Sequence, residues 1–328
     1  MPRKKKAGFD LRRALDRLDK VTSVTLEARE GVPEQVHVFD DPGDRSRKAV
    51  KSALAAGRPL LVRGEPGVGK TQLAMAAAKA LGRPLISFVV DARCESRELL
   101  WQFDSVRRLA EAQVCGVLKC DEETVRKRLR ERNFVKPGPL WWGFDWTSAV
   151  EQSKRYGEEA KLHDSDVEPA EGRVVLIDEI DKADSDLPNG LLEALGSGHF
   201  EPQDCERVAM SEPAPLVIIT TNEERVLPDA FIRRCLVLHL EMPAEGELAD
   251  FLIQRGKRHF PKASATLLRK AAEMLVKDRR ESPLPRPGQA EFFDLLRSVM
   301  ALGTGERKRL ALLKATEEFT LKKHTGAA

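Results

Sequence analysis

The sequence lacks any apolar stretch near the roughly 18 residues that a membrane-spanning helix needs. Basic residues occur at the N-terminus, but no apolar segment follows them as it would in a secretory signal. Lysine and arginine (55) exceed aspartate and glutamate (52) by only 3, so no polybasic field that would favour nucleic acid covers the chain. These absences predict a cytoplasmic protein without a membrane span, for which nucleic acid is a disfavoured but open partner.

The cysteines show no Cys-x-x-Cys pair and no spacing to histidine that is typical of a metal site. There are five of them, an odd number, and they are Cys94, Cys115, Cys120, Cys205 and Cys235. We therefore expect reduced, mostly buried thiols rather than a disulfide framework.

What the sequence does contain is a glycine-rich turn between an apolar segment and a helix-forming segment. Residues 64–71 fit the spacing G-x-x-x-x-G-K-[ST], which lets backbone N–H groups and a helix N-terminus surround a phosphate. Lys70 is expected to reach the β- and γ-phosphates of a nucleoside triphosphate, and the Thr71 hydroxyl to bind Mg²⁺. The residues assigned to nucleotide binding here are Gly64, Glu65, Pro66, Gly67, Val68, Gly69, Lys70, Thr71 and Gln72.

Two later apolar segments, 174–177 and 216–221, are followed by polar residues. Asp178 and Glu179 follow the first, and ligands of open parallel sheets lie beyond the carboxyl ends of the strands, so both carboxylates should face the phosphates. We expect Asp178 to hold hydrated Mg²⁺ and Glu179 to act as the general base for the attacking water. Asn222, after the second segment, is suited to orienting that water.

A short helix over 227–235 carries Arg233 and Arg234 just before another apolar strand, 236–240. Arginine stabilises the charge on a transferring phosphoryl group, and in ring-shaped ATPases the neighbouring subunit supplies it. Arg234 is preferred over Arg233 because it lies last before the strand. The alternative is that both arginines neutralise the C-terminus of the helix.

With these motifs the chain resembles AAA+ ATPases, and within them the MoxR-like ATPases. Residues 64–71 correspond to Walker A, 176–179 to Walker B and 220–222 to sensor 1, and the paired arginines lie at the arginine-finger position. The resemblance places sensor 2 at Arg286, although flanking prolines and Gly288 replace the small hydroxyl residues that are usual there.

The resemblance implies an α/β fold in which a P-loop AAA+ core with a parallel five-stranded sheet is flanked by helices and followed by a small C-terminal all-α lid domain. The chain would comprise an N-terminal basic tail and helix (1–35), the ATPase domain (36–243) with an insertion at about 92–172, and the lid (244–328). Periodicity predicts helices over residues 11–26, 98–110, 121–132, 247–258, 263–278, 289–302 and from 308 onward.

Two features that contain aromatic or imidazole rings each allow two interpretations. Trp141, Trp142 and Trp146 fall in one short segment, and we expect them to pack the insertion onto the sheet, with a protein-contacting patch as the alternative. His37 lies where relatives contact the adenine base, although a surface or core histidine is the simpler interpretation.

The implied activity is ATP hydrolysis, with ATP and Mg²⁺, between the subunits of a ring that is expected to be a hexamer. MoxR-like ATPases are similar to chaperones that remodel or activate partner proteins, often together with a von Willebrand factor A-type protein, and this is the preferred function. Two alternatives stay open: a nucleic-acid-stimulated AAA+ motor, and a nucleotide-gated switch or scaffold that hydrolyses slowly.

Overall fold

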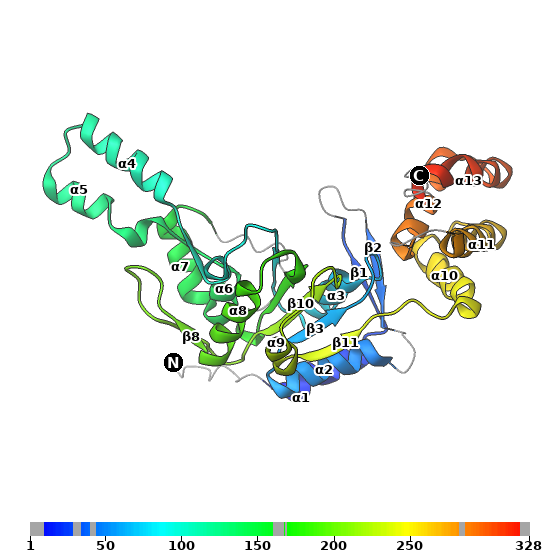
Figure 1. Cartoon of the computed structure of the whole chain (residues 1–328), viewed down its shortest axis with the longest axis horizontal. Coiled ribbons are helices and arrows are strands. Elements are labelled where there is room, and N and C mark those ends of the chain that lie inside the picture. The colour runs from blue at the N-terminus through cyan, green and yellow to red at the C-terminus, as the bar shows by residue number, and fades with distance from the viewer. Residues whose placement is uncertain are drawn as a thin grey trace, which may run out of the picture.

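The structure is a computed structural model of the 328-residue chain and describes residues 10–28, 34–39, 44–159, 167, 169–281 and 286–321. Its centre is a five-stranded sheet in the order β11-β3-β10-β7-β4, in which all neighbouring strands are parallel (Figure 1). The predicted α/β fold with a parallel five-stranded sheet is confirmed. The strands are β3 (Leu60–Arg63), β4 (Leu85–Val89), β7 (Val174–Asp178), β10 (Leu216–Thr221) and β11 (Leu236–His239).

The strand β7 shows why the inner strands read as continuous apolar runs. Alternate residues of a strand point to opposite faces, and both faces of this sheet are covered. Val175 and Ile177 therefore join one buried cluster, while Val174 and Leu176 join another on the opposite face. The chain could not place polar residues at either set of positions without burying them.

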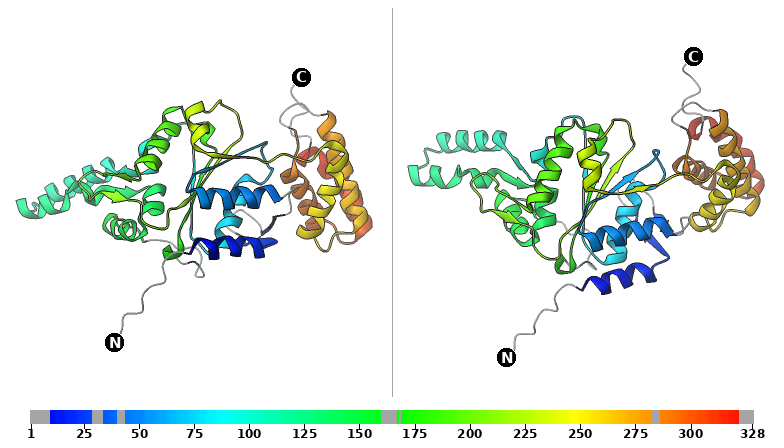
Figure 2. Two further views of the ribbon diagram at one scale, coloured as in Figure 1. Left: turned by 90° about the horizontal axis from the view of Figure 1, so that it is seen from below. Right: turned by 60° about the horizontal axis from the view of Figure 1, so that its bottom comes forward.

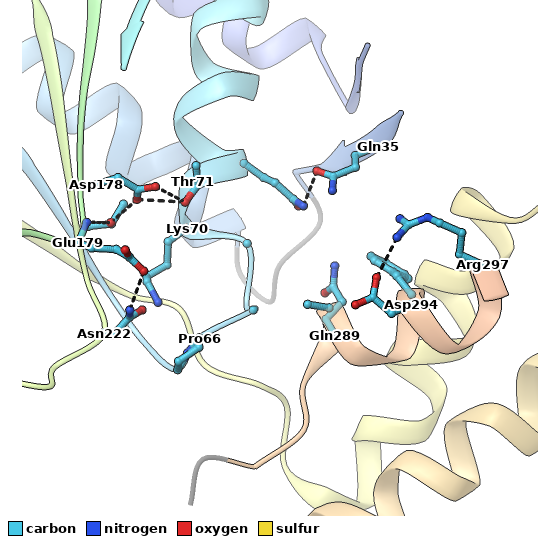
Figure 3. Close-up of a pocket in the computed structure, with 16 residues that line it drawn as sticks. Gln35, Pro66, Lys70, Thr71, Asp178, Glu179, Asn222, Gln289, Asp294 and Arg297 are labelled. Atoms are coloured by element: carbon cyan, nitrogen blue, oxygen red, sulfur yellow. Dashed lines mark hydrogen bonds and ion pairs between the residues drawn. The ribbon is translucent and has the colours of Figure 1, made fainter. Parts of the chain in front are cut away.

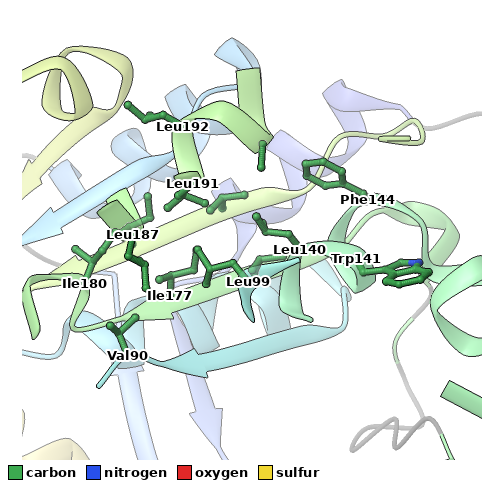
Figure 4. Packing of buried hydrophobic residues seen from close by; sticks show 14 of the residues in the cluster. Val90, Leu99, Leu140, Trp141, Phe144, Ile177, Ile180, Leu187, Leu191 and Leu192 are labelled. Carbon is green, nitrogen blue, oxygen red and sulfur yellow. The ribbon is translucent and has the colours of Figure 1, made fainter. Parts of the chain in front are cut away.

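Helices from different parts of the chain cover the two faces. On one face lie α1 (Leu11–Lys20), α2 (Arg45–Ala56) and α3 (Lys70–Leu81), which share a cluster with β3. On the other lie α6 (Pro139–Phe144) and α8 (Asp186–Ser197), whose apolar residues pack over β7 (Figure 4). The sheet is thus held between two helical layers.

The first helix is shorter than the predicted 11–26. It ends at Lys20, after which residues 21–25 include four that are β-branched and that favour an extended chain. The segment forms β1 (Ser23–Leu26), which pairs antiparallel with β2 (Gln35–Val38). The basic residues 1–7 lie outside the described residues.

The insertion between β4 and β7 also differs from the prediction. Residues 98–110 do not form one helix but contribute to a 3₁₀ turn η2 (Ser96–Leu99), strand β5 (Trp101–Phe103) and helix α4 (Ser105–Val117). The strand β5 pairs antiparallel with β6 (Val135–Pro137), more than thirty residues later. Local periodicity does not report such a distant partner, which is why the short strands were missed.

The second helix of the insertion, α5 (Glu122–Arg128), ends before the predicted residue 132. The Asn133 side-chain amide donates hydrogen bonds to the carbonyl oxygens of Lys127 (2.9 Å) and Arg128 (3.0 Å), which caps this end of the helix. Downstream, α7 (Trp146–Tyr156) follows α6. Trp141 is buried in the sheet cluster and Trp142 packs against it, so the packing prediction is confirmed for these two residues.

Helices are the regular elements among the described residues of the C-terminal region, which has its own buried cluster (Figures 1 and 2). Its observed helices agree closely with the predicted ones, and the bounds of α12 are identical to the prediction. The proposed division near residue 243 stays a prediction. No helix in the described part of the chain is long and apolar enough to cross a bilayer. The helices are α10 (Glu245–His259), α11 (Ala265–Glu281), α12 (Gln289–Leu302) and α13 (Glu306–Thr320).

Two histidines lie where α10 packs against β2. Burial lowers the pKa of His37 to about 3 and that of His259 to about 4, and the Arg255 guanidinium adds to both effects. The Nε2 atoms of both rings are buried without a hydrogen-bond partner in the described residues. The His259 ring also lies 4.1 Å from the Phe293 ring, measured between centroids. This junction between lid and core therefore requires neutral imidazoles.

We expect this junction to weaken in acid. Both pKa values are below the ordinary 6.5, so its contribution to stability is complete above pH 6.5 and decreases as the pH falls toward 4. At pH 5 the loss is roughly 2 kcal/mol for each histidine. Denaturant unfolding of wild type and of a His37→Gln, His259→Gln variant at pH 7.5 and pH 5 measures it, and the variant should lose less stability. Equal losses would contradict the assignment.

Candidate functional site

The glycine-rich turn connects β3 to the N-terminus of α3 and needs glycine at particular positions. Gly64, Gly67 and Gly69 have φ angles of 149°, 78° and 97°. A Cβ atom at Gly64 would lie 2.2 Å from the carbonyl oxygen of Leu240, so a side chain has no room there. Gly69 is the N-cap of α3 and provides no side-chain cap, which leaves the first N–H groups of this helix to bind a ligand.

Lys70 is buried beneath this turn. Its Nζ donates hydrogen bonds to the carbonyl oxygens of Gly64 (2.7 Å) and Glu65 (2.9 Å). Burial lowers the pKa of Lys70, while nearby carboxylates, first among them Asp178, oppose the shift. An ammonium group held by two carbonyls at the edge of a cavity fits an anionic ligand such as a phosphate group.

Asp178, at the end of β7, faces the first turn of α3. Its two carboxylate oxygens accept hydrogen bonds from Thr71 Oγ1 at 3.0 and 2.9 Å, and one of them accepts another from Thr220 Oγ1 at 2.5 Å (Figure 3). A carboxylate beside a hydroxyl is the oxygen donor set that Mg²⁺ prefers. Thr71 and Asp178 therefore fit the ion. Thr220 belongs to the segment assigned to sensor 1 but was given no role of its own, and it connects two neighbouring strands through this contact.

Glu179 adopts a left-handed backbone conformation, with φ 59° and ψ 49°, which is unusual for a residue other than glycine. Its N–H donates to Thr220 Oγ1 at 2.9 Å. The turn directs its carboxylate into the cavity, where it accepts hydrogen bonds from Asn222 Nδ2 (3.1 Å) and Lys182 Nζ (2.5 Å). The hydrogen bond to Glu179 raises the pKa of Lys182. Glu179 and Asn222 are thus adjacent, as expected for a base and a residue that orients water.

Asp181 is a further residue that the motifs did not assign. It is 1% exposed, and its carboxylate accepts hydrogen bonds from the backbone N–H groups of Asn222 (3.3 Å) and Glu224 (2.9 Å). It positions the end of β10 relative to β7. The only sequence signal was an acidic residue three positions after Asp178.

The cavity between core and lid has a volume of about 250 Å³. The lid contributes residues of α12 to its lining, and Gln35 of β2 lies at its edge, where its Oε1 accepts a hydrogen bond from Gln72 Nε2 at 2.7 Å. A second lid residue, Arg279 of α11, forms an ion pair with Glu65 at 2.6 Å. The lid therefore touches the glycine-rich turn directly. The predicted residues that line this cavity are Pro66, Gly67, Gly69, Lys70, Thr71, Gln72, Asp178, Glu179 and Asn222.

Gly64, Glu65 and Val68 belong to the turn without lining the cavity, and four other predicted residues lie away from both. Arg233 and Arg234 are exposed at the end of α9 (Asp229–Arg234) and do not line the cavity. His37 faces the lid junction and not the cavity, and Gln35 takes the position at its edge. Arg286 is exposed before α12 and is not brought to the site.

Arg297 is the lid arginine that lines the cavity. It forms an ion pair with Asp294 at 2.8 Å, and both lie on the cavity side of α12 (Figure 3). Gln289, Phe293 and Arg297 are spaced by four residues, which places them on one face of the helix. This periodicity, counted from the predicted start at Gln289, was the signal that could have indicated Arg297.

Replacing Arg297 with alanine should weaken ATP binding. A hydrogen bond to a charged group contributes about 1.5–3 kcal/mol, which corresponds to a loss of roughly tenfold or more in affinity. The matched control is Arg286→Ala, which should bind as wild type does. Titration of each protein with a fluorescent ATP analogue tests this, and the opposite ranking of the two variants would assign the role to Arg286.

Comparison with known proteins agrees with this geometry. The family described as AAA domain (dynein-related subfamily) matches residues 59–235. The matched segment runs from the residue before β3 to the residue after α9, and so includes the glycine-rich turn, both carboxylates, Asn222 and the paired arginines. No curated protein matches the chain.

Proposed function

The chain belongs to the AAA domain family, dynein-related subfamily, and from that premise we propose that it hydrolyses ATP between the subunits of a ring and thereby remodels or activates partner proteins. The observation that carries this proposal is the cavity in which Lys70, Asp178 and Glu179 converge beneath lid residues. The proposed ring is a hexamer, and the branch proposed within the family is the MoxR-like one, with a von Willebrand factor A-type protein among the possible clients.

Binding is assigned to the turn and to the two oxygen donors beside it. Backbone N–H groups of residues 64–71 and the Lys70 ammonium would hold the phosphates. Thr71 and Asp178 would hold Mg²⁺, which when bound neutralises phosphate charge. Arg297 would contact the nucleotide from the lid, so that binding draws lid and core together.

Catalysis is assigned to Glu179, which would accept a proton from the attacking water while Asn222 orients it. The ion pair of Glu179 with Lys182, at 2.5 Å, occupies one carboxylate oxygen. Loosening this pair would free that oxygen to accept the proton. The left-handed backbone of Glu179 supports the assignment, because strained backbone at the edge of a cavity is typical of functional residues.

The arginine finger that completes each site is assigned to the neighbouring subunit. Arg233 and Arg234 are exposed and lie outside the cavity of their own chain, while Arg58 donates a hydrogen bond to the carbonyl oxygen of Arg234 at 3.1 Å and so supports this end of α9. Exposed arginines on a supported helix end suit insertion into the cavity of the next protomer.

Two measurements test the action on proteins. Proteins that co-purify with a Glu179→Gln variant in ATP, but not with the same variant without nucleotide, are the expected clients. Hydrolysis should not respond to added polynucleotide. Strong stimulation by polynucleotide, with a steep dependence on salt, would instead identify a nucleic-acid motor.

A further inference from the structure

The insertion carries a helical arm, here defined as residues 104–130, which consists of α4, α5 and their connection. Figures 1 and 2 show that the arm extends away from the sheet at the end of the molecule opposite to the lid. Its base is held by the β5–β6 pair and by Asp104, which caps α4 and accepts a hydrogen bond from the Tyr156 hydroxyl at 2.9 Å. None of its residues lines the nucleotide cavity.

The inner face of α4 makes contacts within the insertion. Cys115 is buried there. Glu111 forms an ion pair with Arg128 of α5 at 2.5 Å, and Arg108 forms one with Glu131 at 2.9 Å. These contacts fix the orientation of α4, so its opposite face is the one presented outward.

The outer face of α4 is apolar and uncovered. Val106, Leu109 and Val117 are 77%, 62% and 83% exposed, and Val114 and Leu118 are exposed beside them. Together these are five of the ten large apolar side chains that are exposed in the described residues. Val106, Leu109 and Val117 lie on one side of α4 and form a stripe there, in which the polar Gln113 lies between Leu109 and Val117. Single exposed apolar residues are ordinary, whereas a continuous patch indicates an interaction site.

The charges of the arm indicate what covers this stripe. The arm contains seven lysines and arginines and five aspartates and glutamates, a basic surplus of two. Arg108, Arg126 and Arg128 are in ion pairs. Lys119 and Arg130 are exposed and have no ion-pair partner in the described chain. A second copy of the chain would bring like charges together, which disfavours it as the occupant.

We propose that the outer face of α4 docks an amphipathic helix of a partner protein, whose apolar stripe is flanked by acidic residues. The apolar stripe of such a helix would pack against the exposed apolar side chains of α4. The basic surplus of the arm favours acidic residues beside that stripe in the partner helix. The proposal stands apart from hydrolysis, because the arm and the cavity share no residue.

The test uses two labelled synthetic helical peptides with the same leucine stripe, one flanked by glutamate and the other by lysine. Fluorescence anisotropy with the full-length protein should show the glutamate peptide binding about tenfold more tightly, and weakening as salt rises. A variant with Val106→Ser, Leu109→Ser and Val117→Ser should lose about tenfold in affinity for it. Its basal ATP hydrolysis should equal that of wild type.

The matched control is Leu302→Ser with Phe319→Ser, which changes apolar residues 60% and 74% exposed on the lid and should bind the peptide as wild type does. Should the serine variant of the arm fail to fold, Lys119→Glu with Arg130→Glu gives a second test and should reverse the preference between the peptides. Equal binding of both peptides, or binding unaffected by either arm variant, overturns the proposal. Sedimentation that shows self-association lost in the arm variant overturns it too, in favour of a second copy.

Discussion

Replacing Glu179 with glutamine should lower kcat for ATP hydrolysis by about 10²–10⁴-fold, the usual contribution of a general base. Affinity for ATP should stay close to wild type. The amide keeps the size of the side chain and its contact with Asn222, 3.1 Å in the wild-type structure, but it accepts no proton from water. Single-turnover hydrolysis measures the chemical step, and a nucleotide titration measures affinity in the same preparation.

A matched control for this variant is Glu224→Gln. The backbone N–H of Glu224 donates to Asp181 at 2.9 Å, and its side chain does not line the cavity, so hydrolysis should be unchanged. Full activity in Glu179→Gln would refute its role as base. Loss of ATP binding in that variant would instead indicate that Glu179 maintains the fold of the site.

Replacing Arg234 with alanine should lower turnover by about 10³-fold or more, the magnitude associated with an arginine finger. Binding of ATP to the isolated subunit should be nearly intact, because the arginine is exposed and outside the cavity of its own chain. Arg233→Ala is the matched comparison, because it removes the same charge one residue earlier. The larger loss identifies the finger.

Mixing two inactive variants tests whether the arginine acts between subunits. A Glu179→Gln subunit retains Arg234, and an Arg234→Ala subunit retains the base. When they assemble together, some interfaces combine an intact base with an intact arginine, so activity should reappear. Failure of the mixture to recover any activity, when sedimentation shows that mixed rings form, would refute action between subunits.

The site residues differ in how far sequence could predict them. The turn at 64–71 is a continuous segment whose spacing alone specifies a phosphate-binding geometry. Asp178 could be placed opposite Thr71 because parallel strands end at a common edge. The individual roles of Asp181 and Thr220 could not be predicted, since they depend on contacts between segments separated by about 40 residues.

The lid illustrates the same limit. The sequence alone determined its helices, including the bounds of α12, because helical periodicity is a local signal. It did not determine which lid arginine lines the cavity. Arg286 and Arg297 are both basic residues of the lid, and nothing in their sequence neighbours distinguishes them. Only the docking of α12 over the turn brings Arg297 to the cavity and leaves Arg286 exposed.

By itself the sequence determined the strands at 174–177, 216–221 and 236–240, the glycine-rich turn and the acidic strand end, because each of these is specified by neighbouring residues. Only the tertiary structure decided the β5–β6 pair, the orientation of α4 with its apolar face outward, and the lid residues above the cavity. The physical reason is that these features depend on packing between segments that are distant along the chain. The free energy of that packing cannot be read from the residues of one segment alone.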